Sequence, residues 1–302
     1  MDKSKRKFIM VGLGEILWDM LPEGKQLGGA PANFAYHAQA LGGRGVVVSC
    51  IGDDDLGKEI LGCLDEMKLD GQYVAVDGGH PTGTVTVRLD ENGKPDYIIH
   101  ENVAWDFIPS SSALLSLAAE TDAVCFGSLC QRSEVSQKTV RSFLTATRPD
   151  CIRLFDINIR QSYYNKDVVN TMLELSNVLK LNDDELAIVA GLLGIEGSET
   201  DVLSEMIQRY DLSLIALTKG TEGSRLYTGS RDSECEAAPI DKIADTVGAG
   251  DAFSAALAVG WLRGDDLEKI NAKASRVASF VCSQSGATPP LPDDLIQEKQ
   301  KY

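Results

Sequence analysis

Short β-rich runs alternate with helical stretches along this chain of 302 residues, and this alternation constrains its fold more than any other feature. The β-rich runs cover residues 8–11, 45–49, 123–126, 152–155 and 214–217. Helices of about 10–15 residues are expected between and after them, at residues 32–41, 56–67, 135–145, 167–177, 183–192, 199–210, 250–262 and 267–285. The pattern predicts an α/β fold with a doubly wound, mostly parallel sheet.

One segment interrupts this rhythm. Residues 82–90 and 96–101 are β-rich and flank an Asn-Gly turn, which predicts a β-hairpin. We expect this hairpin and the irregular stretch at 18–28 to form a small β lid that covers a ligand site and excludes water. An edge hairpin without a function is the alternative.

Composition excludes several classes of protein. The net charge of −16 opposes binding to nucleic acid and to anionic membranes, and no apolar run approaches the roughly 18 residues of a membrane span. The seven cysteines form no CxxC pair, which favours reduced thiols over disulfides or a zinc site. We therefore expect a cytoplasmic protein that binds small molecules, with neither nucleic acid nor membrane as a partner.

The segment Asp245-Thr-Val-Gly-Ala-Gly-Asp251-Ala-Phe253 leads into a predicted helix of small residues. Gly248 and Gly250 allow a sharp turn and a close approach to a ligand, and the free N–H groups of a helix N-terminus attract anionic oxygen. Asp251 would lie in the first turn, where it can take a proton from a hydroxyl that attacks phosphorus. The alternative is an ordinary glycine-rich loop whose aspartate stabilises the helix dipole.

Two familiar nucleotide-binding fingerprints fail. Gly12-Leu-Gly14-Glu-Ile-Leu17 has leucine where the dinucleotide motif needs its third glycine. Gly52-Asp-Asp-Asp-Leu-Gly57-Lys58-Glu59 has the P-loop spacing, but glutamate replaces the Ser or Thr that would bind Mg²⁺, and three carboxylates would repel ATP. These failures argue against a Rossmann oxidoreductase and a P-loop NTPase.

Polar residues near the first strand can serve a sugar. Asp19, in Gly14-Glu-Ile-Leu-Trp-Asp19, places a carboxylate just beyond that strand, at the edge where open α/β sheets bind ligands. Asn33, in Gly28-Gly-Ala-Pro-Ala-Asn33, offers both a donor and an acceptor to a hydroxyl. Taken alone, the first is also a surface aspartate and the second a loop with a helix cap.

Residues after three later strands can serve a phosphate. Asp156, Asn158 and Arg160 occupy alternate positions and are predicted to point one way, so that Arg160 can steady a transferring phosphate. Asn182 and Glu185 are spaced to hold Mg²⁺ through water, or to form a helix N-cap and its capping-box partner. The turn Thr218-Lys-Gly220-Thr-Glu-Gly223 lets backbone approach nucleotide phosphates, although glycine-rich hairpins look similar.

Taken in order, these residues resemble the signatures of the ribokinase-like, or PfkB, family of sugar kinases over residues 11–292. The C-terminal signature matches Asp245-Thr-Val-Gly-Ala-Gly-Asp-Ala-Phe253, and the N-terminal one matches Gly28-Gly-Ala-Pro-Ala-Asn-Phe-Ala35 and continues to Gly42. The resemblance implies one ribokinase-like kinase domain over residues 1–302, with a β lid inserted from about 16–30 and 82–104. It also implies ATP and Mg²⁺ as cofactors.

The resemblance implies a role for each matching residue. Asp251 would be the catalytic base, in an anion hole formed by residues 248–251, namely Gly248, Ala249, Gly250 and Asp251 itself. The sugar or its phosphate would contact Asp19, Gly29, Asn33 and Arg160. ATP would contact Thr218, Gly220, Gly223, Lys180, Asn182, Gly250, Asn271 and Ser275, with residues 271–286 as the adenine wall. Mg²⁺ would be organised by Asn182 and Glu185 through water, and K⁺ would bind near Asp245 and the loop after Cys282.

Within the family, the chain resembles the fructokinase subgroup. Ala30 stands where ribokinase-type members tend to carry lysine, and Ala104-Trp-Asp-Phe107 and Gly127-Ser-Leu-Cys-Gln-Arg132 support the subgroup, although 2-keto-3-deoxygluconate kinases share much of the pattern. The implied reaction is transfer of the γ-phosphoryl of Mg·ATP to the primary 6-hydroxyl of a ketohexose, D-fructose. Kinases of 2-keto-3-deoxygluconate, ribose or a nucleoside, and a silent sugar-binding regulator, are the alternatives. Apolar alternation at 84–89 and 97–99 would permit a homodimer through the lid.

Overall fold

A large sheet forms the body of the molecule in the computed structural model, which describes residues 6–21, 24–89, 95–240 and 242–296. The strands of this sheet are β1 (Ile9–Leu13), β4 (Arg44–Gly52), β5 (Asp70–Asp77), β8 (Ala123–Phe126), β9 (Ile152–Asp156), β10 (Val178–Asn182), β11 (Leu214–Thr218), β12 (Ser224–Tyr227) and β13 (Asp232–Cys235). Their order is β13-β12-β11-β10-β9-β8-β1-β4-β5. Only the pairs β11–β12 and β12–β13 are antiparallel, so the predicted mostly parallel sheet is confirmed.

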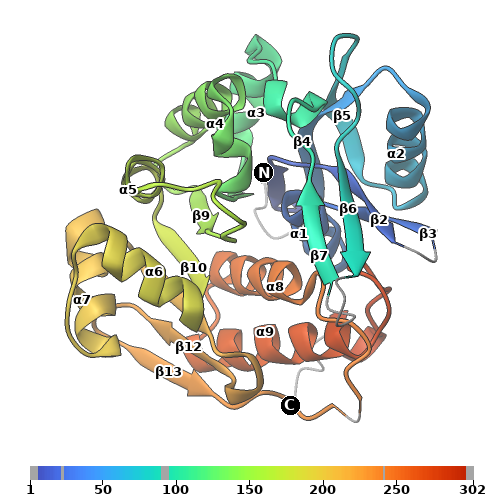
Figure 1. Cartoon of the computed structure of the whole chain (residues 1–302). Coiled ribbons are helices and arrows are strands. Elements are labelled where there is room, and N and C mark those ends of the chain that lie inside the picture. The colour runs from blue at the N-terminus through green and yellow to red at the C-terminus, as the bar shows by residue number, and fades with distance from the viewer. Residues whose placement is uncertain (1–5, 22–23, 90–94, 241, 297–302) are drawn as a thin grey trace.

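Helices cover both faces of this sheet (Figure 1). They are α1 (Ala30–Ala40), α2 (Asp55–Glu66), α3 (Ser112–Glu120), α4 (Glu134–Ala146), α5 (Lys166–Leu175), α6 (Asp183–Leu193), α7 (Glu199–Tyr210), α8 (Ala249–Arg263), α9 (Leu267–Cys282) and α10 (Asp293–Ile296). Helices α1, α8 and α9 share one buried cluster, whereas α3 to α7 share another on the opposite face. This two-sided cover is the doubly wound arrangement expected from the alternation of strands and helices.

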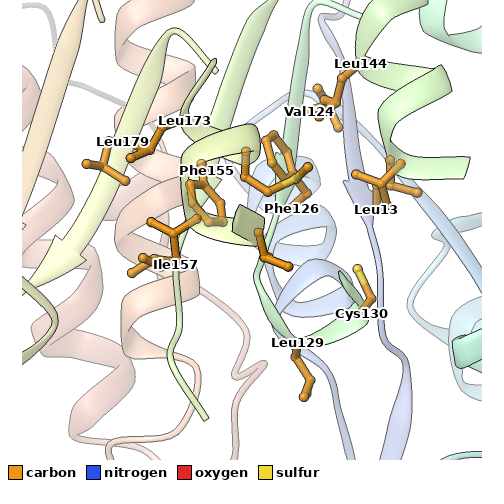
Figure 2. Close-up of a cluster of buried hydrophobic side chains, with 14 of the residues drawn as sticks. Leu13, Val124, Phe126, Leu129, Cys130, Leu144, Phe155, Ile157, Leu173 and Leu179 are labelled. Atoms are coloured by element: carbon orange, nitrogen blue, oxygen red, sulfur yellow. The ribbon is translucent and has the colours of Figure 1, made fainter. Parts of the chain in front are cut away.

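Aromatic packing fixes the ends of the central strands. Phe126 at the end of β8 stacks on Phe155 near the end of β9, with ring centroids 5.4 Å apart and both rings fully buried. Leu13 of β1 and Leu179 of β10 extend the same cluster on either side (Figure 2). Burying such a side chain contributes roughly 1.5–3 kcal/mol. The residues that follow these strands therefore leave the sheet from fixed points.

A second, four-stranded sheet stands beside the carboxyl ends of the large sheet. Its strands are β2 (Leu17–Leu21), β3 (Gly24–Gly28), β6 (Thr84–Leu89) and β7 (Pro95–Ile99), in the order β3-β2-β6-β7. The pair β6–β7 is antiparallel, as predicted for the hairpin, whereas its Asn-Gly turn lies outside the described residues. Trp18 anchors the small sheet, because its indole N–H donates to the carbonyl of Leu56 at 3.0 Å.

Candidate active site

The N-terminus of α8 lies at the centre of the candidate site. Gly248 caps the helix with φ 78°, and a Cβ there would lie 2.5 Å from the carbonyl oxygen of Ala287, so only glycine fits this turn. A Cβ on Gly250 would lie 2.8 Å from Nζ of Lys180. The first N–H groups of α8 have no partner within the helix. They lie at this turn, beside the buried ammonium group of Lys180. The turn is suited to an anion, as the sequence predicted for residues 248–250.

Asp251 lies in the first turn of α8 and is held by α1. The side-chain amide of Asn33 donates to Oδ2 of Asp251 at 2.8 Å. The pKa of Asp251 is raised to about 6, chiefly by burial and also by the neighbouring Asp156, whereas Asn33, Lys180 and Arg160 oppose the rise. A carboxylate with this pKa is a base that stays ionised at neutral pH and is still able to accept a proton.

A buried ion pair supports the same turn from below. Lys180 of β10 donates to Oδ1 of Asp156 at 2.9 Å, and Ser254 of α8 donates to Oδ2 of that carboxylate at 2.8 Å. Asp156 is 3% exposed and Lys180 is 8% exposed, so the pair is almost wholly removed from water. Burial lowers the pKa of Lys180, but Asp156, Glu185 and Asp251 raise it above its ordinary value, which keeps the ammonium charged.

The predicted alignment of Asp156, Asn158 and Arg160 is wrong. Strand β9 ends at Asp156, and Asn158 has φ 45°, in the left-handed region, so the alternation of a strand does not continue to Arg160. Arg160 lies in an exposed loop, where its guanidinium donates to the carbonyl of Ile159 at 3.0 Å. Its charge nevertheless acts on Asp19 and Asp251, whose pKa values it lowers.

Asn182 and Glu185 form a capping box at the start of α6. Oδ1 of Asn182 accepts from the N–H of Glu185 at 2.8 Å, and Oε2 of Glu185 accepts from the N–H of Asn182 at 2.9 Å. The other oxygen of Glu185 accepts from the N–H of Ile159 at 2.8 Å, and the residue is 5% exposed. Each carboxylate oxygen keeps a lone pair, so the pair fits Mg²⁺ held through water better than direct coordination.

Asp19 is a predicted site residue that lies on the small sheet. It lies on β2, and its carboxylate packs over Gly28 of β3 so closely that a Cβ on Gly28 would collide with it. Burial raises the pKa of Asp19 to about 6, while Arg160 lowers it. Among the described residues no hydrogen-bond donor reaches this carboxylate, which leaves it free for a ligand. Gly29 begins α1 with φ 112°, and its Cβ would collide with the carbonyl oxygen of Glu15.

The residues predicted to bind nucleotide fall into two groups. Thr218 ends β11, and Gly220 and Gly223 have φ 53° and 98° in the turn that follows, which opens on the same sheet edge as Asn182. Asn271 and Ser275 of α9 instead bond to Ser224 at 2.6 and 2.9 Å. Asn271 is fully buried, and its amide also donates to the carbonyl of Ser233 at 2.8 Å. These contacts tie α9 to the β12–β13 hairpin, and an adenine contact there stays a prediction.

Asp245 joins two loops beside the helix turn. The N–H groups of Ala244 and Asp245 donate to the carbonyl of Cys282 at 2.9 and 3.3 Å. Its own carboxylate accepts from the N–H of Val247 at 3.0 Å and of Gly286 at 3.4 Å. The side chain therefore shapes the loops, and any cation here would take backbone carbonyls as ligands.

Glu15 is a part of the site that was not assigned from the sequence. It lies two residues after the end of β1, is 2% exposed, and its Oε2 has no hydrogen-bond partner among the described residues. The pKa of Glu15 is raised to about 7, chiefly by burial and also by the charge of Asp251, against a lowering by its own N–H. Its position at the carboxyl end of the first strand was the available signal. Burial and the charge of Asp251 both disfavour a second negative charge at this place.

Two negative findings apply to the residues with described positions. In this part of the chain no helix is long and apolar enough to cross a membrane. Nor does any group of three or more His, Cys, Asp or Glu side chains there have the arrangement of a metal site.

The chain is similar to known sugar kinases. The model of the pfkB family carbohydrate kinases matches residues 23–294. A Pyrococcus horikoshii protein described as a sugar kinase is 28% identical over 97% of this chain and 96% of its own. Its crystal structure in complex with ATP has a TM-score of 0.77 at 25% identity and covers 93% of this chain and 94% of that one.

Fructokinases are similar as well. The fructokinase of Klebsiella pneumoniae is 29% identical over 94% of this chain and 96% of its own. A fructokinase double mutant from Vibrio cholerae, with fructose, ADP and potassium bound, shares the fold with a TM-score of 0.78 at 23% identity, covering 95% of each chain. Because the family model covers most of the sequence, the protein is a sugar kinase, a phosphotransferase with an alcohol group as acceptor, and this chain belongs to the pfkB family of carbohydrate kinases.

Proposed function

We propose that this protein phosphorylates the primary 6-hydroxyl of D-fructose with Mg·ATP, as a single kinase domain with the lid at residues 16–30 and 82–104. The observation that carries the proposal is the Asn33–Asp251 hydrogen bond at the N-terminus of α8, which holds a carboxylate beside an anion-binding turn. The similarity to proteins named fructokinase supports the choice of sugar.

The charges of the site favour a neutral sugar over a keto acid. A substrate carboxylate would need a cation of its own, but Lys180 is paired with Asp156, and Arg132 is paired with Asp106 at 2.7 Å. Lys219, next to Thr218, is paired with Glu199 at 2.8 Å. Arg160 has no ion pair among the described residues, but the transferring phosphate needs its charge. The unpartnered carboxylate of Asp19 accepts hydrogen bonds from hydroxyls and repels a carboxylate.

In the proposed reaction, Asp251 accepts the proton of the 6-hydroxyl as that oxygen attacks the γ-phosphorus. The bond to the β–γ bridging oxygen breaks, and the electron pair leaves with ADP. The N–H groups at residues 248–251 and the guanidinium of Arg160 stabilise the charge on the phosphoryl group. Asn182 and Glu185 would hold Mg²⁺ through water, and it would neutralise the phosphate oxygens. Asp251 then releases its proton to solvent, and the lid excludes water that would hydrolyse ATP.

The remaining assignments follow from the same site. We place ATP along Thr218, Gly220, Gly223, Gly250, Asn271 and Ser275, and K⁺ at the loops that Asp245 joins. All seven cysteines are free, which supports the reducing cytoplasm as the compartment. Met20, 37% exposed on β2, offers apolar surface for a homodimer through the lid.

The test is ADP release with Mg·ATP and K⁺ across fructose, ribose, 2-keto-3-deoxygluconate, adenosine and tagatose. Strong turnover with fructose alone is the expected result. Turnover with another member would keep the mechanism and replace the sugar. No turnover across the panel, with ATP still bound, would refute the proposal and favour a sugar-binding regulator.

A further inference from the structure

The loop that carries Arg160 is held at both ends by other parts of the site. On the nucleotide side, the N–H of Ile159 donates to Oε1 of Glu185 at 2.8 Å. On the lid side, the hydroxyl of Tyr163 donates to Oε1 of Glu101 at 2.8 Å. The N–H of Tyr163 in turn donates to the carbonyl of Arg160 at 3.1 Å. The backbone of Arg160 therefore lies between the capping box of α6 and the base of the lid.

The conformation of this loop is imposed from outside. Asn158 has φ 45° and Gln161 has φ 47°, so two non-glycine residues in the left-handed region flank Arg160. Such conformations are unfavourable in isolation and persist only where the surroundings enforce them, which is common at functional sites. The hydrogen bonds of Glu185 and Tyr163, on either side of Asn158 and Gln161, hold the loop in this conformation. Loss of either contact would let the backbone at Arg160 relax.

The lid end of this connection is itself anchored to the large sheet. Arg132, from the segment after β8, lies 4.0 Å from the ring centroid of Trp105 and 4.8 Å from that of Tyr163. Its guanidinium binds Asp106 at 2.7 and 2.9 Å and donates to the carbonyl of His100 at 2.6 Å. His100 and Glu101 directly follow lid strand β7. The guanidinium of Arg132 thus contacts both the base of the lid and the ring of Tyr163.

We propose that Tyr163 is a positioning residue that couples the lid to Arg160. The hydroxyl of Tyr163 bonds to Glu101 at the lid base, its ring packs on Arg132, and its backbone holds Arg160. A lid ordered over sugar then fixes Arg160 toward the phosphoryl group, and a nucleotide that orders Glu185 fixes the same loop from the other side. The inference rests on the proposed function, since it takes Arg160 as a contact of sugar and phosphate.

The first test compares Tyr163→Phe with Tyr164→Phe, a neighbour for which no side-chain hydrogen bond is found among the described residues. Loss of this hydrogen bond loosens Arg160, which is proposed to stabilise the transferring phosphoryl group. Tyr163→Phe should therefore lower kcat/KM for the sugar about threefold to tenfold, mainly through kcat, with an unchanged Tm. Tyr164→Phe is expected to match wild type. The assay uses fructose, or whichever sugar of the panel is turned over.

The second test asks whether the two sites are coupled. Fructose affinity is measured by calorimetry with and without a non-hydrolysable ATP analogue. In wild type the analogue is expected to tighten fructose binding. The coupling ratio, which is the Kd of fructose without the analogue divided by the Kd with it, is expected to fall toward one in Tyr163→Phe and in Glu101→Ala. Glu101→Gln keeps an acceptor for the tyrosine hydroxyl and should restore it. The Tyr163→Phe/Glu101→Ala double variant should lose no more than either single variant.

The outcomes separate this inference from the proposed function. A wild-type protein that turns over no sugar of the panel refutes the proposed function. An active wild type whose Tyr163→Phe variant keeps its kcat/KM and its coupling ratio refutes only the role of Tyr163. Equal losses in Tyr163→Phe and Tyr164→Phe would assign the effect to general packing of the loop and also overturn the inference.

Discussion

The proposed site has a phosphate half around α8 and a sugar half on the small sheet, and the two halves are built differently. Around α8, almost every polar side chain already has a partner, from Asn33 on Asp251 to Lys180 and Ser254 on Asp156. On the lid, Asp19 has no hydrogen-bond donor among the described residues. The first half rests on the large sheet, whereas the second belongs to a four-stranded sheet inserted into it.

This difference matches the demands on each half. Charge that develops during phosphoryl transfer is best stabilised by groups fixed beforehand, because they need not reorganise when the reaction occurs. Hydroxyl recognition instead needs an acceptor that the sugar itself satisfies, since a carboxylate already bonded to protein would gain little. Substitutions in the two halves should therefore change different kinetic quantities.

The largest expected effect is that of Asp251→Asn. Asparagine still offers Asn33 an acceptor but cannot take a proton, so kcat should fall by about 10²–10⁴-fold while ATP affinity stays nearly unchanged. ADP release and nucleotide binding are measured on the same preparation. Asp167→Asn, an exposed first-turn aspartate of α5, serves as the control. Near-normal turnover of Asp251→Asn would remove Asp251 as the base.

Breaking the buried pair beneath the turn should mainly affect folding. Lys180→Met leaves the Asp156 carboxylate without its cation in a buried place, and a loss of roughly 3–5 kcal/mol in the free energy of unfolding is expected. Lys138→Met breaks an exposed pair with Glu134, which should cost at most about 0.5 kcal/mol. Urea titration measures both. Equal, small losses would mean that the phosphate half is not built on this pair.

Asp19→Ala tests the sugar half. Removal of a charged acceptor for sugar hydroxyls should raise the fructose KM by about 10–100-fold, with a much smaller change in kcat. Met20→Ala, at the next position on the same strand, should leave KM close to wild type. A pure kcat effect of Asp19→Ala would move this residue into the phosphate half.

The smallest expected effect concerns pH. Burial raises the pKa of Asp251 to about 6, and the base acts only when deprotonated. The value of kcat/KM should therefore be constant at higher pH and fall as pH drops through about 6, approaching tenfold per unit below it. Asp251→Asn should lack this acidic limb in its residual activity. A limb that persists in the variant would belong to another group, such as Asp19 or Glu15, whose pKa values are raised to about 6 and about 7.

Much of the fold followed from the sequence because its strands are apolar runs between clear helical patterns. Strands β5 and β10, which were not singled out, have weaker signals: β5 alternates exposed and half-buried residues at the sheet edge, and the apolar run of β10 is interrupted by Lys180. Helix α3 was missed as well, although Ser111 caps it. The lid hairpin was predicted because an Asn-Gly turn between β-rich runs is a strong local signal.

The site was predictable where one short segment builds it. The helix turn at 248–251 and the capping box of Asn182 and Glu185 are local, so their residues could be placed from spacing alone. Contacts between distant segments, such as Ser254 on Asp156 or Tyr163 on Glu101, depend on tertiary packing. The alignment of Arg160 failed for the same reason, because the left-handed residue Asn158 breaks the strand.

The most direct test of the two-part site compares initial rates of Asp251→Asn and Asp19→Ala as fructose is raised to saturation with Mg·ATP in excess. We predict that Asp19→Ala approaches the wild-type maximum rate, while Asp251→Asn stays at least about 10²-fold below it at every concentration. If Asp251→Asn recovers with sugar, or if Asp19→Ala stays depressed at saturation, the division of the site into a phosphate half and a sugar half is wrong.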